Sequence, residues 1–508
     1  MPNAHPRNVM FIIIDQMRAD LLHGALAEHV PLPNLRALMG EAVSFTRHYS
    51  VANPCGPSRA SILTGQYAMN HRSVRNGAPL RHDTPNLATE IRKGGHLPLL
   101  FGYTDTTLDP RLHQPVDPDL RTYERVIPGF VQVVEMGADE SFPWRASLVA
   151  KGYDLPDYAD FYVPVAEEGQ PRRVDDPAFY RADDSDTAFL TDACLTHLRA
   201  RGGRPWFAHL IYIRPHPPLV APAPYNRMID PATLPLPDRL ASQNDELAVH
   251  PFFTPANAAA LVEGFPDLCN DDATVQTLRA IYLGLASEVD AHIGRVIAFL
   301  KDSGQWDDTL LVVTADHAEM LGDRHSWGKM SPYAAAWHTP LIIRDPSRAT
   351  AHGTQLDQPT ESVDVTPTIL ECLGQTPPPS MDGRSLLPLL DGVLPDNWRT
   401  HSYCELDFGN PATQTRWQSA HDLHASAANF AVLRGPRYTL VHFADTLPPL
   451  LFDAEGDGEM RDLAGEPMMA PVLLEMTQKL LSHRMCNADH TLSTTQITAD
   501  GPVTAPRR

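Results

Sequence analysis

Residues 55–65 read CGPSRASILTG and predict a helix with a cysteine at its N-terminal mouth. Pro57 suits the first helical position, where its missing N–H is not needed, and Gly65 suits the stop. Unpaired N–H groups and the positive end of the helix dipole favour an anion or a thiolate beside Cys55. Arg59, one turn in, adds a charged fork of donors. An inert buried cysteine is the alternative, but this setting indicates a reactive cysteine where an anion binds.

The composition indicates a globular protein with one large core and a smaller domain. The chain has 508 residues, 43% of them hydrophobic and 20% charged, which is ordinary for a protein that folds. With 41 basic and 62 acidic residues the net charge is -21, which argues against nucleic acid or an anionic membrane as a partner. A site for anions must therefore gather its positive charge locally.

Cysteine usage and the N-terminus favour a reducing compartment. The six cysteines are scattered without close pairs, so neither a disulfide framework nor a zinc ribbon is expected. The apolar run from Val9 to Ile14 is too short for a signal segment or a membrane span. We therefore expect a cytoplasmic protein.

Apolar runs and helical patterns alternate along the first three quarters of the chain. The runs lack polar alternation, as expected of strands covered on both faces of a parallel sheet; they are 9–14, 97–101, 206–212, 310–313 and 340–343. Helical patterns fall at 34–42, 86–93, 187–199 and 272–302. This order predicts an open α/β fold with a large mixed, mostly parallel sheet and helices on both of its faces.

The pattern changes after about residue 385, where short strand candidates replace the alternation. They lie at 401–407, 430–433 and 438–442, and a last helix is predicted near 471–483. We expect a catalytic α/β domain over 1–384, a smaller α+β domain with an antiparallel sheet over 385–486, and a polar arm or tail over 487–508. The irregular stretch 109–186 is left unassigned.

Polar residues that follow two of the apolar runs suggest a metal site. Asp15 ends the first run, and Asp316 and His317 follow the run at 310–313; ligands bind beyond the carboxyl ends of strands in such sheets. Together with an oxygen from a modified Cys55, these side chains would suit Mg²⁺, Mn²⁺ or Ca²⁺ better than zinc. Taken singly, the aspartates could cap turns and the histidine could lie on the surface.

The segment at 55–65 resembles the sulfatase signature, Cys-x-Pro-Ser-Arg followed by Thr-Gly, at every fixed position. In that family of the alkaline phosphatase superfamily the cysteine is oxidised to formylglycine, whose hydrated aldehyde is the nucleophile. The resemblance implies that Asp15, Cys55, Asp316 and His317 bind one divalent metal ion. Two positions depart from the family pattern. Gln16 stands where many sulfatases have a second aspartate, and Ala318 replaces a glycine; if that glycine serves a positive φ, alanine carries a cost here.

Further segments resemble the phosphonate monoester hydrolase branch of the superfamily, and they cover nearly the whole chain. They are NVMFIIIDQMRADL (8–21), MNHRSVRN (69–76), FGYTDTTLDPR (101–111), YIRPHPPLVA (212–221), LGDRHSWGK (321–329), DVTPTIL (364–370), DGRSLLPLL (382–390) and CNADHTL (486–492). The resemblance implies that Asn76, Tyr103, His216 and Lys329 line the substrate pocket and that Arg59 braces the nucleophile. Asp105 replaces a threonine of the relatives.

These roles predict a formylglycine-dependent, metal-assisted hydrolase of monoanionic esters. Sulfate monoesters are the expected substrates, with phosphonate monoester and phosphodiester activity beside them, because the carboxylate of Asp105 would repel a dianion more than a monoanion. Lys329 and His216 would stabilise or protonate the leaving oxygen. His71 and His216 are two candidates for the base that regenerates the aldehyde, and the sequence does not assign it.

Three alternatives stay open at this point. The chain could be a dedicated phosphonate monoester hydrolase or phosphodiesterase with sulfatase side activity, a thiolate or metal-only phosphodiesterase with Cys55 unmodified, or a degenerate member that only binds anions. A formylglycine-generating maturation enzyme is an expected partner. The tail resembles that of oligomeric relatives, so we expect a homo-oligomer, either a dimer or a tetramer.

Overall fold

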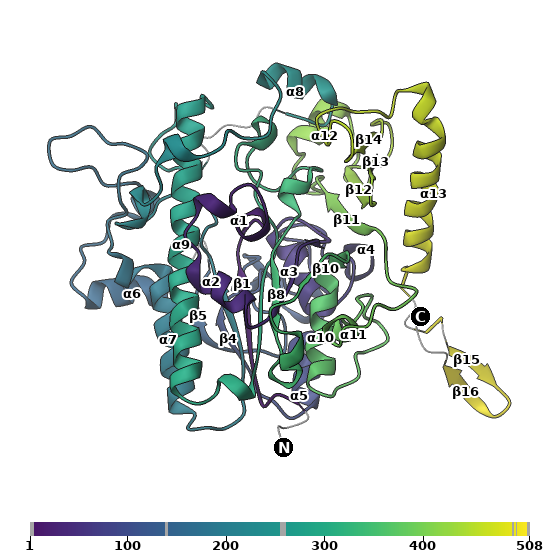
Figure 1. Ribbon diagram of the computed structural model, residues 1–508, viewed down its shortest axis with the longest axis horizontal. Helices are drawn as coiled ribbons and strands as arrows, with labels where there is room; N and C mark the ends of the chain where they lie inside the picture. The colour runs from purple at the N-terminus through teal and green to yellow at the C-terminus, as the bar shows by residue number, and fades with distance from the viewer. Residues whose placement is uncertain (1–4, 138–140, 255–260, 490–491, 494, 505–508) are drawn as a thin grey trace. The chain divides into compact units, whose positions relative to one another are not determined.

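The computed structural model describes residues 5–137, 141–254, 261–489, 492–493 and 495–504 (Figure 1). The chain forms two compact units. The first unit comprises the chain up to His48, His96–Tyr103 and Phe130–Gln358, and the second comprises Tyr49–Gly95, Thr104–Gly129 and the chain from Pro359. Among the described residues, no helix is both long and apolar enough to cross a membrane.

An eight-stranded mixed sheet organises the first unit, in the order β5-β4-β6-β1-β7-β8-β2-β9. The strands are β1 (Asn8–Ile14), β2 (Val43–Phe45), β4 (Pro98–Gly102), β5 (Val131–Glu135), β6 (Phe207–Tyr212), β7 (Thr309–Ala315), β8 (Leu341–Arg344) and β9 (Gln355–Leu356). The central strands β4, β6, β1 and β7 run parallel, whereas β8 is antiparallel to β7 and β2 is antiparallel to β8. The predicted mixed, mostly parallel sheet is confirmed.

The parallel strands that the sequence predicted in this sheet are fully buried. Every residue of β1, β4, β6 and β7 is buried, which is why their sequences lack polar alternation. In β1 and β7 the register pairs Ile14 with Ala315. The residues that follow these two strands are therefore brought side by side.

Helices of the first unit pack on one another and on the sheet. They are α1 (Asp20–His23), α2 (Pro33–Met39), α6 (Phe142–Ala150), α7 (Asp186–Ala200), α8 (Gln243–Val249) and α9 (Asp272–Asp302). The long α9 lies beside α7 and α2 (Figure 1), and α7 packs on β6. Asp271 caps α9 by accepting the N–H of Thr274 at 2.8 Å, so the predicted helix at 272–302 is confirmed at both ends.

The second unit contains the predicted antiparallel sheet. Its strands are β11 (Ser402–Asp407), β12 (Asn429–Arg434), β13 (Tyr438–Phe443) and β14 (Leu450–Asp453), paired antiparallel in sequence order. Its helices are α3 (Cys55–Thr64), α4 (Ala68–His71), α5 (Leu87–Lys93), α10 (Val365–Cys372), α11 (Leu387–Leu390), α12 (Arg416–His421) and α13 (Ala470–Cys486). Two further short strands are β3 (His48–Tyr49) and β10 (Thr360–Glu361).

Three features differ from what the sequence predicted. The helix α3 begins at Cys55 rather than after it, with Pro57 in its first turn, because none of the first four N–H groups of a helix has an intrahelical partner. The run at 340–343 forms the antiparallel strand β8. The tail includes a hairpin of β15 (Thr495–Thr498) and β16 (Gly501–Thr504). The domain boundary near residue 385 stays a prediction; the compact units follow other limits.

Candidate active site

Two buried carboxylates lie at the carboxyl ends of neighbouring strands in the first unit. Asp15 follows β1 and Asp316 follows β7, and both side chains are fully buried. Two like charges held together away from water are unfavourable unless a positive charge lies between them. The pair is therefore suited to a cation.

His317 adds a third group of a metal-binding type. Its Nε2 lies 3.8 Å from an oxygen of Asp15 and 3.8 Å from an oxygen of Asp316; this is too long for hydrogen bonds but suits ligands of one shared ion. Its Nδ1–H donates to the carbonyl of Ala318 at 3.2 Å, which leaves a lone pair on Nε2. Burial lowers the pKa of His317 to about 4. The neutral ring and the carboxylates fit a divalent cation that prefers oxygen ligands.

Gln16 is fixed beside these three residues by its backbone. It has a φ of 66°, in the left-handed region; its N–H donates to Asp316 Oδ1 at 3.1 Å, and its carbonyl accepts the hydroxyl of Tyr282 at 2.7 Å. Such a backbone costs about 1–3 kcal/mol, which these bonds offset. Ala318 is not among the residues with positive φ, so alanine in place of glycine carries no backbone cost here.

Lys329 and His216 meet in the same unit, although 113 residues separate them. The Lys329 ammonium donates to Gln16 Oε1 at 2.7 Å and to His216 Nε2 at 2.9 Å. His216 Nδ1–H donates to the carbonyl of Pro217, so its Nε2 is the acceptor. Loss of hydration and the neighbouring ammonium hold the pKa of His216 well below its ordinary value. Lys329 is therefore the proton-bearing member of the pair.

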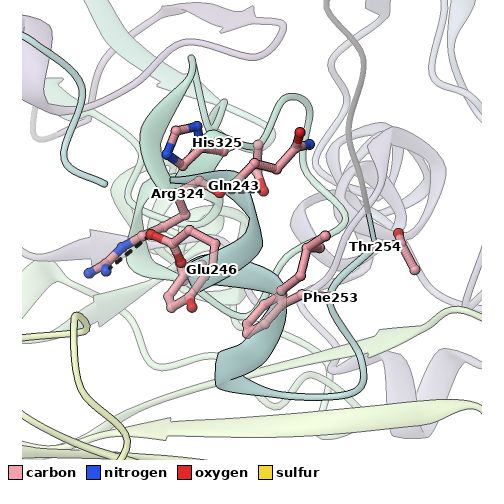
Figure 2. Close-up of a pocket in the computed structure, with 9 residues that line it drawn as sticks. Gln243, Glu246, Phe253, Thr254, Arg324 and His325 are labelled. Carbon is pink, nitrogen blue, oxygen red and sulfur yellow. Dashed lines mark hydrogen bonds and ion pairs between the residues drawn. The ribbon is translucent and has the colours of Figure 1, made fainter. Parts of the chain in front are cut away.

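The loop that leads to Lys329 is held in a strained conformation. Arg324 and His325 have φ of 55° and 47°. Figure 2 shows the pocket beside them, in which Arg324 forms an ion pair with Glu246 of α8 at 3.7 Å. His325 Nε2 donates to the carbonyl of Leu240 at 3.0 Å. These contacts offset the strain and fix the backbone that precedes Lys329.

Tyr103, predicted to line the substrate pocket, contacts a metal-ligand candidate. Its side chain is 2% exposed and its hydroxyl donates to Asp15 Oδ2 at 3.3 Å. A donor in this position orients a carboxylate ligand.

In the second unit, α3 holds Cys55 at its first position, and every residue of the helix is buried. The N–H of Gly56 donates to Asn76 Oδ1 at 2.9 Å, so Asn76 caps the first turn from another segment. Cys55 is only 6% exposed. The predicted nucleophile and the predicted pocket residue thus meet at the helix mouth.

Arg59 and Asp105 form a buried ion pair beside the same turn. Arg59 Nη1 lies 3.5 Å from Asp105 Oδ2, and the two side chains are 0% and 2% exposed. A Cβ on Gly56 would lie 3.1 Å from the carbonyl of Asp105, so this backbone abuts α3. The Asp105 side chain therefore lies in a buried ion pair and does not face water as a turn residue would.

His71, one of the two candidate bases, is committed to structural hydrogen bonds. Its Nδ1 accepts the N–H of Ser73 at 3.1 Å, and its Nε2 lies 2.9 Å from Ser61 Oγ. Because Nδ1 accepts, the proton is on Nε2, which donates to Ser61. Burial lowers the pKa of His71 to about 3. Neither nitrogen is available to take a proton, so the role predicted for His71 is not supported.

Each unit thus brings together part of the predicted site. The first unit gathers Asp15, Asp316, His317, His216, Lys329 and Tyr103, and the second gathers Cys55, Arg59, Asn76 and Asp105. The sequence did not single out Glu319, which contacts Gln16. Its place three residues after Asp316 was the only signal available.

Comparisons with known proteins agree with this arrangement. A family model described as Sulfatase matches residues 7–375, and one described as N-sulphoglucosamine sulphohydrolase, C-terminal, matches residues 322–486. The chain is 39% identical over 510 residues to the multifunctional alkaline phosphatase superfamily protein PehA of Trinickia caryophylli, covering 96% of this chain and 97% of that protein.

Two solved structures are similar over their whole length. The phosphonate monoester hydrolase SpPMH from Silicibacter pomeroyi is 60% identical, with a TM-score of 0.97 and 99% of each chain covered. The phosphonate monoester hydrolase of Agrobacterium radiobacter is 39% identical, with a TM-score of 0.93, and the match covers 99% of this chain and 100% of that chain. The similarity therefore includes both compact units.

Proposed function

Because the chain belongs to the sulfatase family of the alkaline phosphatase superfamily, we propose that it hydrolyses monoanionic phosphonate monoesters, phosphodiesters and sulfate monoesters. The observation that carries the proposal is the convergence of Asp15, Asp316 and His317, two buried carboxylates and a neutral imidazole suited to one cation. The relatives named as phosphonate monoester hydrolases support phosphorus as a reaction centre.

We propose that Cys55, oxidised to formylglycine, faces these three residues and is the fourth ligand. All four side chains are buried and of metal-binding types. A bound Mg²⁺, Mn²⁺ or Ca²⁺ would supply Lewis acidity at the nucleophile and at the ester oxygens. Tyr103 would keep the carboxylate of Asp15 aimed at the ion.

The remaining residues would bind the ester and release its leaving group. Arg59 and the N-terminal end of α3 provide local positive charge in a chain of net charge -21. Lys329 would donate a proton or a hydrogen bond to the leaving oxygen, and His216 would hold the ammonium in place. Asn76 would stabilise the first turn of α3.

Parallel kinetics test the proposal. We expect turnover of an aryl phosphonate monoester, an aryl phosphodiester and an aryl sulfate, measured as kcat/KM under the same conditions. A higher value for the sulfate would favour the arylsulfatase expectation, and a higher value for the phosphonate would favour the dedicated phosphonate hydrolase. Binding of sulfate or phosphonate without turnover of any ester would favour a degenerate anion-binding protein.

Mass spectrometry distinguishes the formylglycine enzyme from one that uses an unmodified thiolate or metal alone. In the tryptic peptide that ends at Arg59, we expect the sulfur of Cys55 to be replaced by a carbonyl oxygen. A fully active preparation with an intact thiol would contradict the formylglycine mechanism. The proposal also includes a maturation enzyme as partner, a cytoplasmic location and a homo-oligomer. These parts need experiments other than the kinetics and the mass spectrometry.

A further inference from the structure

Glu319 is a buried carboxylate that the proposed function does not use. We propose that Glu319 is a positioning residue that aims the Lys329 ammonium at the leaving oxygen. This inference rests on the proposed function, in which Lys329 acts on the leaving group. It gives a role to a residue that touches neither the ester nor the metal ligands' oxygens.

Glu319 accepts hydrogen bonds from both segments that set the position of Lys329. Its side chain is 2% exposed. One oxygen accepts the amide Nε2–H of Gln16. The other accepts the backbone N–H of Leu321 at 3.0 Å and that of Gly328. Gly328 directly precedes Lys329, so one carboxylate controls both the acceptor of the ammonium and the backbone that carries it.

The Gln16 amide can have only one orientation in this network. A carboxylate is an acceptor and an ammonium is a donor, so Nε2 must face Glu319 and Oε1 must face Lys329. The distance of 2.7 Å between Lys329 Nζ and Gln16 Oε1 fits this assignment. Without the carboxylate, the ammonium of Lys329 would be the one group in these contacts that still favours this orientation of the amide.

The side chain of lysine needs such help more than most. It carries a compact charge on a flexible four-carbon stem. Gln16 Oε1 and His216 Nε2 direct two of its three N–H groups, and this fixes the direction of the third. An ammonium that is held within a fraction of an ångström of its working position needs no reorganisation during the reaction.

Replacing Glu319 with Gln tests the inference through leaving-group dependence. The substitution keeps the volume but offers one acceptor oxygen in place of two, so either the backbone N–H groups or Gln16 must face an N–H group. We expect kcat to fall for aryl phosphonates and sulfates, with KM little changed. The fall should be about tenfold larger for an ester of a weakly acidic phenol than for the 4-nitrophenyl ester, because a poor leaving group depends most on protonation.

A swap of the two functional groups gives a sharper test. In the double variant Glu319→Gln with Gln16→Glu, the amide and the carboxylate exchange places across the same hydrogen bond. Lys329 then faces a carboxylate oxygen in place of the amide oxygen of Gln16, so it keeps an acceptor. We expect the leaving-group dependence to return toward that of the wild type. If the fold-change in kcat of the double variant equalled the product of the two single fold-changes, Glu319 and Gln16 would not be coupled. That result would overturn the inference.

Asp290→Asn is the matched control. Asp290 is also a buried carboxylate of the first unit, 1% exposed, and it accepts the N–H groups of Asn34 at 3.1 Å and Leu35 at 2.7 Å. It should lower thermal stability without changing the leaving-group dependence. The result to compare is kcat for each ester in the two variants at an equal loss of Tm. If Glu319→Gln lowered kcat equally for all esters, as Asp290→Asn does, Glu319 would have only a structural role.

Two further measurements keep the inference separable from the proposed function. If wild-type protein hydrolysed none of the esters, the proposed function would fail, and a crystal structure of Glu319→Gln would still decide the positioning. Lys329 Nζ remaining within hydrogen-bond distance of both the Gln16 amide and His216 Nε2 in that variant would contradict the inference. If Glu319→Gln failed to fold, Glu319→Asp would replace it, with the same expected dependence on the leaving group.

Discussion

Asp105 combines a left-handed backbone with a buried ion pair to Arg59. Its φ is 50°, a region that aspartate and asparagine tolerate and that β-branched residues avoid. Threonine, the residue of the relatives, would therefore bring backbone strain at this position as well as a loss of charge. Asparagine at this position would remove the charge without adding backbone strain.

We predict that Asp105→Asn selectively raises turnover of phosphate monoesters. Removing the carboxylate leaves the charge of Arg59 uncompensated, which favours a dianion over a monoanion; the relative gain should be about tenfold in kcat/KM. The measurement is kcat/KM for an aryl phosphate and an aryl sulfate. The control is Asp109→Asn, four residues after Asp105, which removes a carboxylate paired with Arg111. It should leave the ratio of the two kcat/KM values unchanged. An equal change for both esters in Asp105→Asn would contradict the charge argument.

The metal ligands give a second prediction at this scale. Treatment with a chelator should abolish turnover, and Mn²⁺, Ca²⁺ or Mg²⁺ should restore it. Asp316→Ala and His317→Ala should each lower kcat/KM at least about 100-fold and lower the bound metal found by elemental analysis. Their circular dichroism should match that of the wild type. Full activity in either variant, or in metal-free protein, would rule out the metal role.

Among the elements, α9 carries an unusual buried acid. Glu288 is fully buried, and burial raises its pKa to about 8, with the carboxylate of Asp186 adding to the rise and Ser185 and Arg214 opposing it. The folded state therefore holds a proton that the unfolded chain, with a pKa near 4.5, releases earlier. Stability linked to Glu288 is complete below pH 4.5 and is lost as the pH rises toward 8.

We predict that Glu288→Gln flattens the dependence of stability on pH. Glutamine keeps the shape of the protonated acid and cannot ionise. The wild type should lose up to about 1.4 kcal/mol of unfolding free energy per pH unit within this window, and the variant should not. Urea denaturation at pH 5 and pH 8 measures both. Equal slopes in the two proteins would show that Glu288 does not titrate in this range.

Long buried elements could be predicted from the sequence, and elements that are short or exposed could not. β1, β4, β6 and β7 stood out because parallel strands are apolar on both faces, and α9 because it is long and periodic. β2 and β9 are only three and two residues long, too short for any period. β5 lies at the edge of the sheet and is mostly exposed.

The site shows the same division. Strand ends indicated Asp15 and Asp316, because the position of a strand end follows from the apolar run before it. The contact of Lys329 with His216 and Gln16 depends on loops with positive φ, and no local pattern specifies where such loops lead. Family resemblance named Lys329 and His216, but only the geometry separates the proton-bearing lysine from the neutral histidine.

At the scale of the whole molecule, α13 exposes an apolar stripe. Leu474, Leu481 and Met485 lie on one face of the helix by their spacing and are 59%, 56% and 67% exposed. Exposed apolar stripes often mark protein–protein contacts. The net charge of this chain otherwise favours separate molecules, so the stripe is the part of the surface that we expect to form the proposed homo-oligomer.

We predict that Leu474→Asp combined with Leu481→Asp dissociates this oligomer. A carboxylate on each of two neighbouring turns cannot be buried without a partner. Sedimentation velocity should give an oligomer for the wild type and a monomer for the variant. Ser482→Asp adds a carboxylate at an exposed polar position of the same helix and should not change the mass. A monomeric wild type, or an oligomer that survives the double change, would exclude this face.

The burial of α3 would set a time limit on the proposed oxidation of Cys55. The helix is enclosed only after later parts of the chain exist: the Thr366 hydroxyl donates to the carbonyl of Ile62 at 2.6 Å across 304 residues of sequence. At about 5–20 residues per second, the ribosome needs about 15–60 s to make that stretch. If Cys55 is oxidised to formylglycine as proposed, the oxidising enzyme would meet the exposed thiol during this interval. The yield of active protein would then depend on how quickly that enzyme meets the nascent chain.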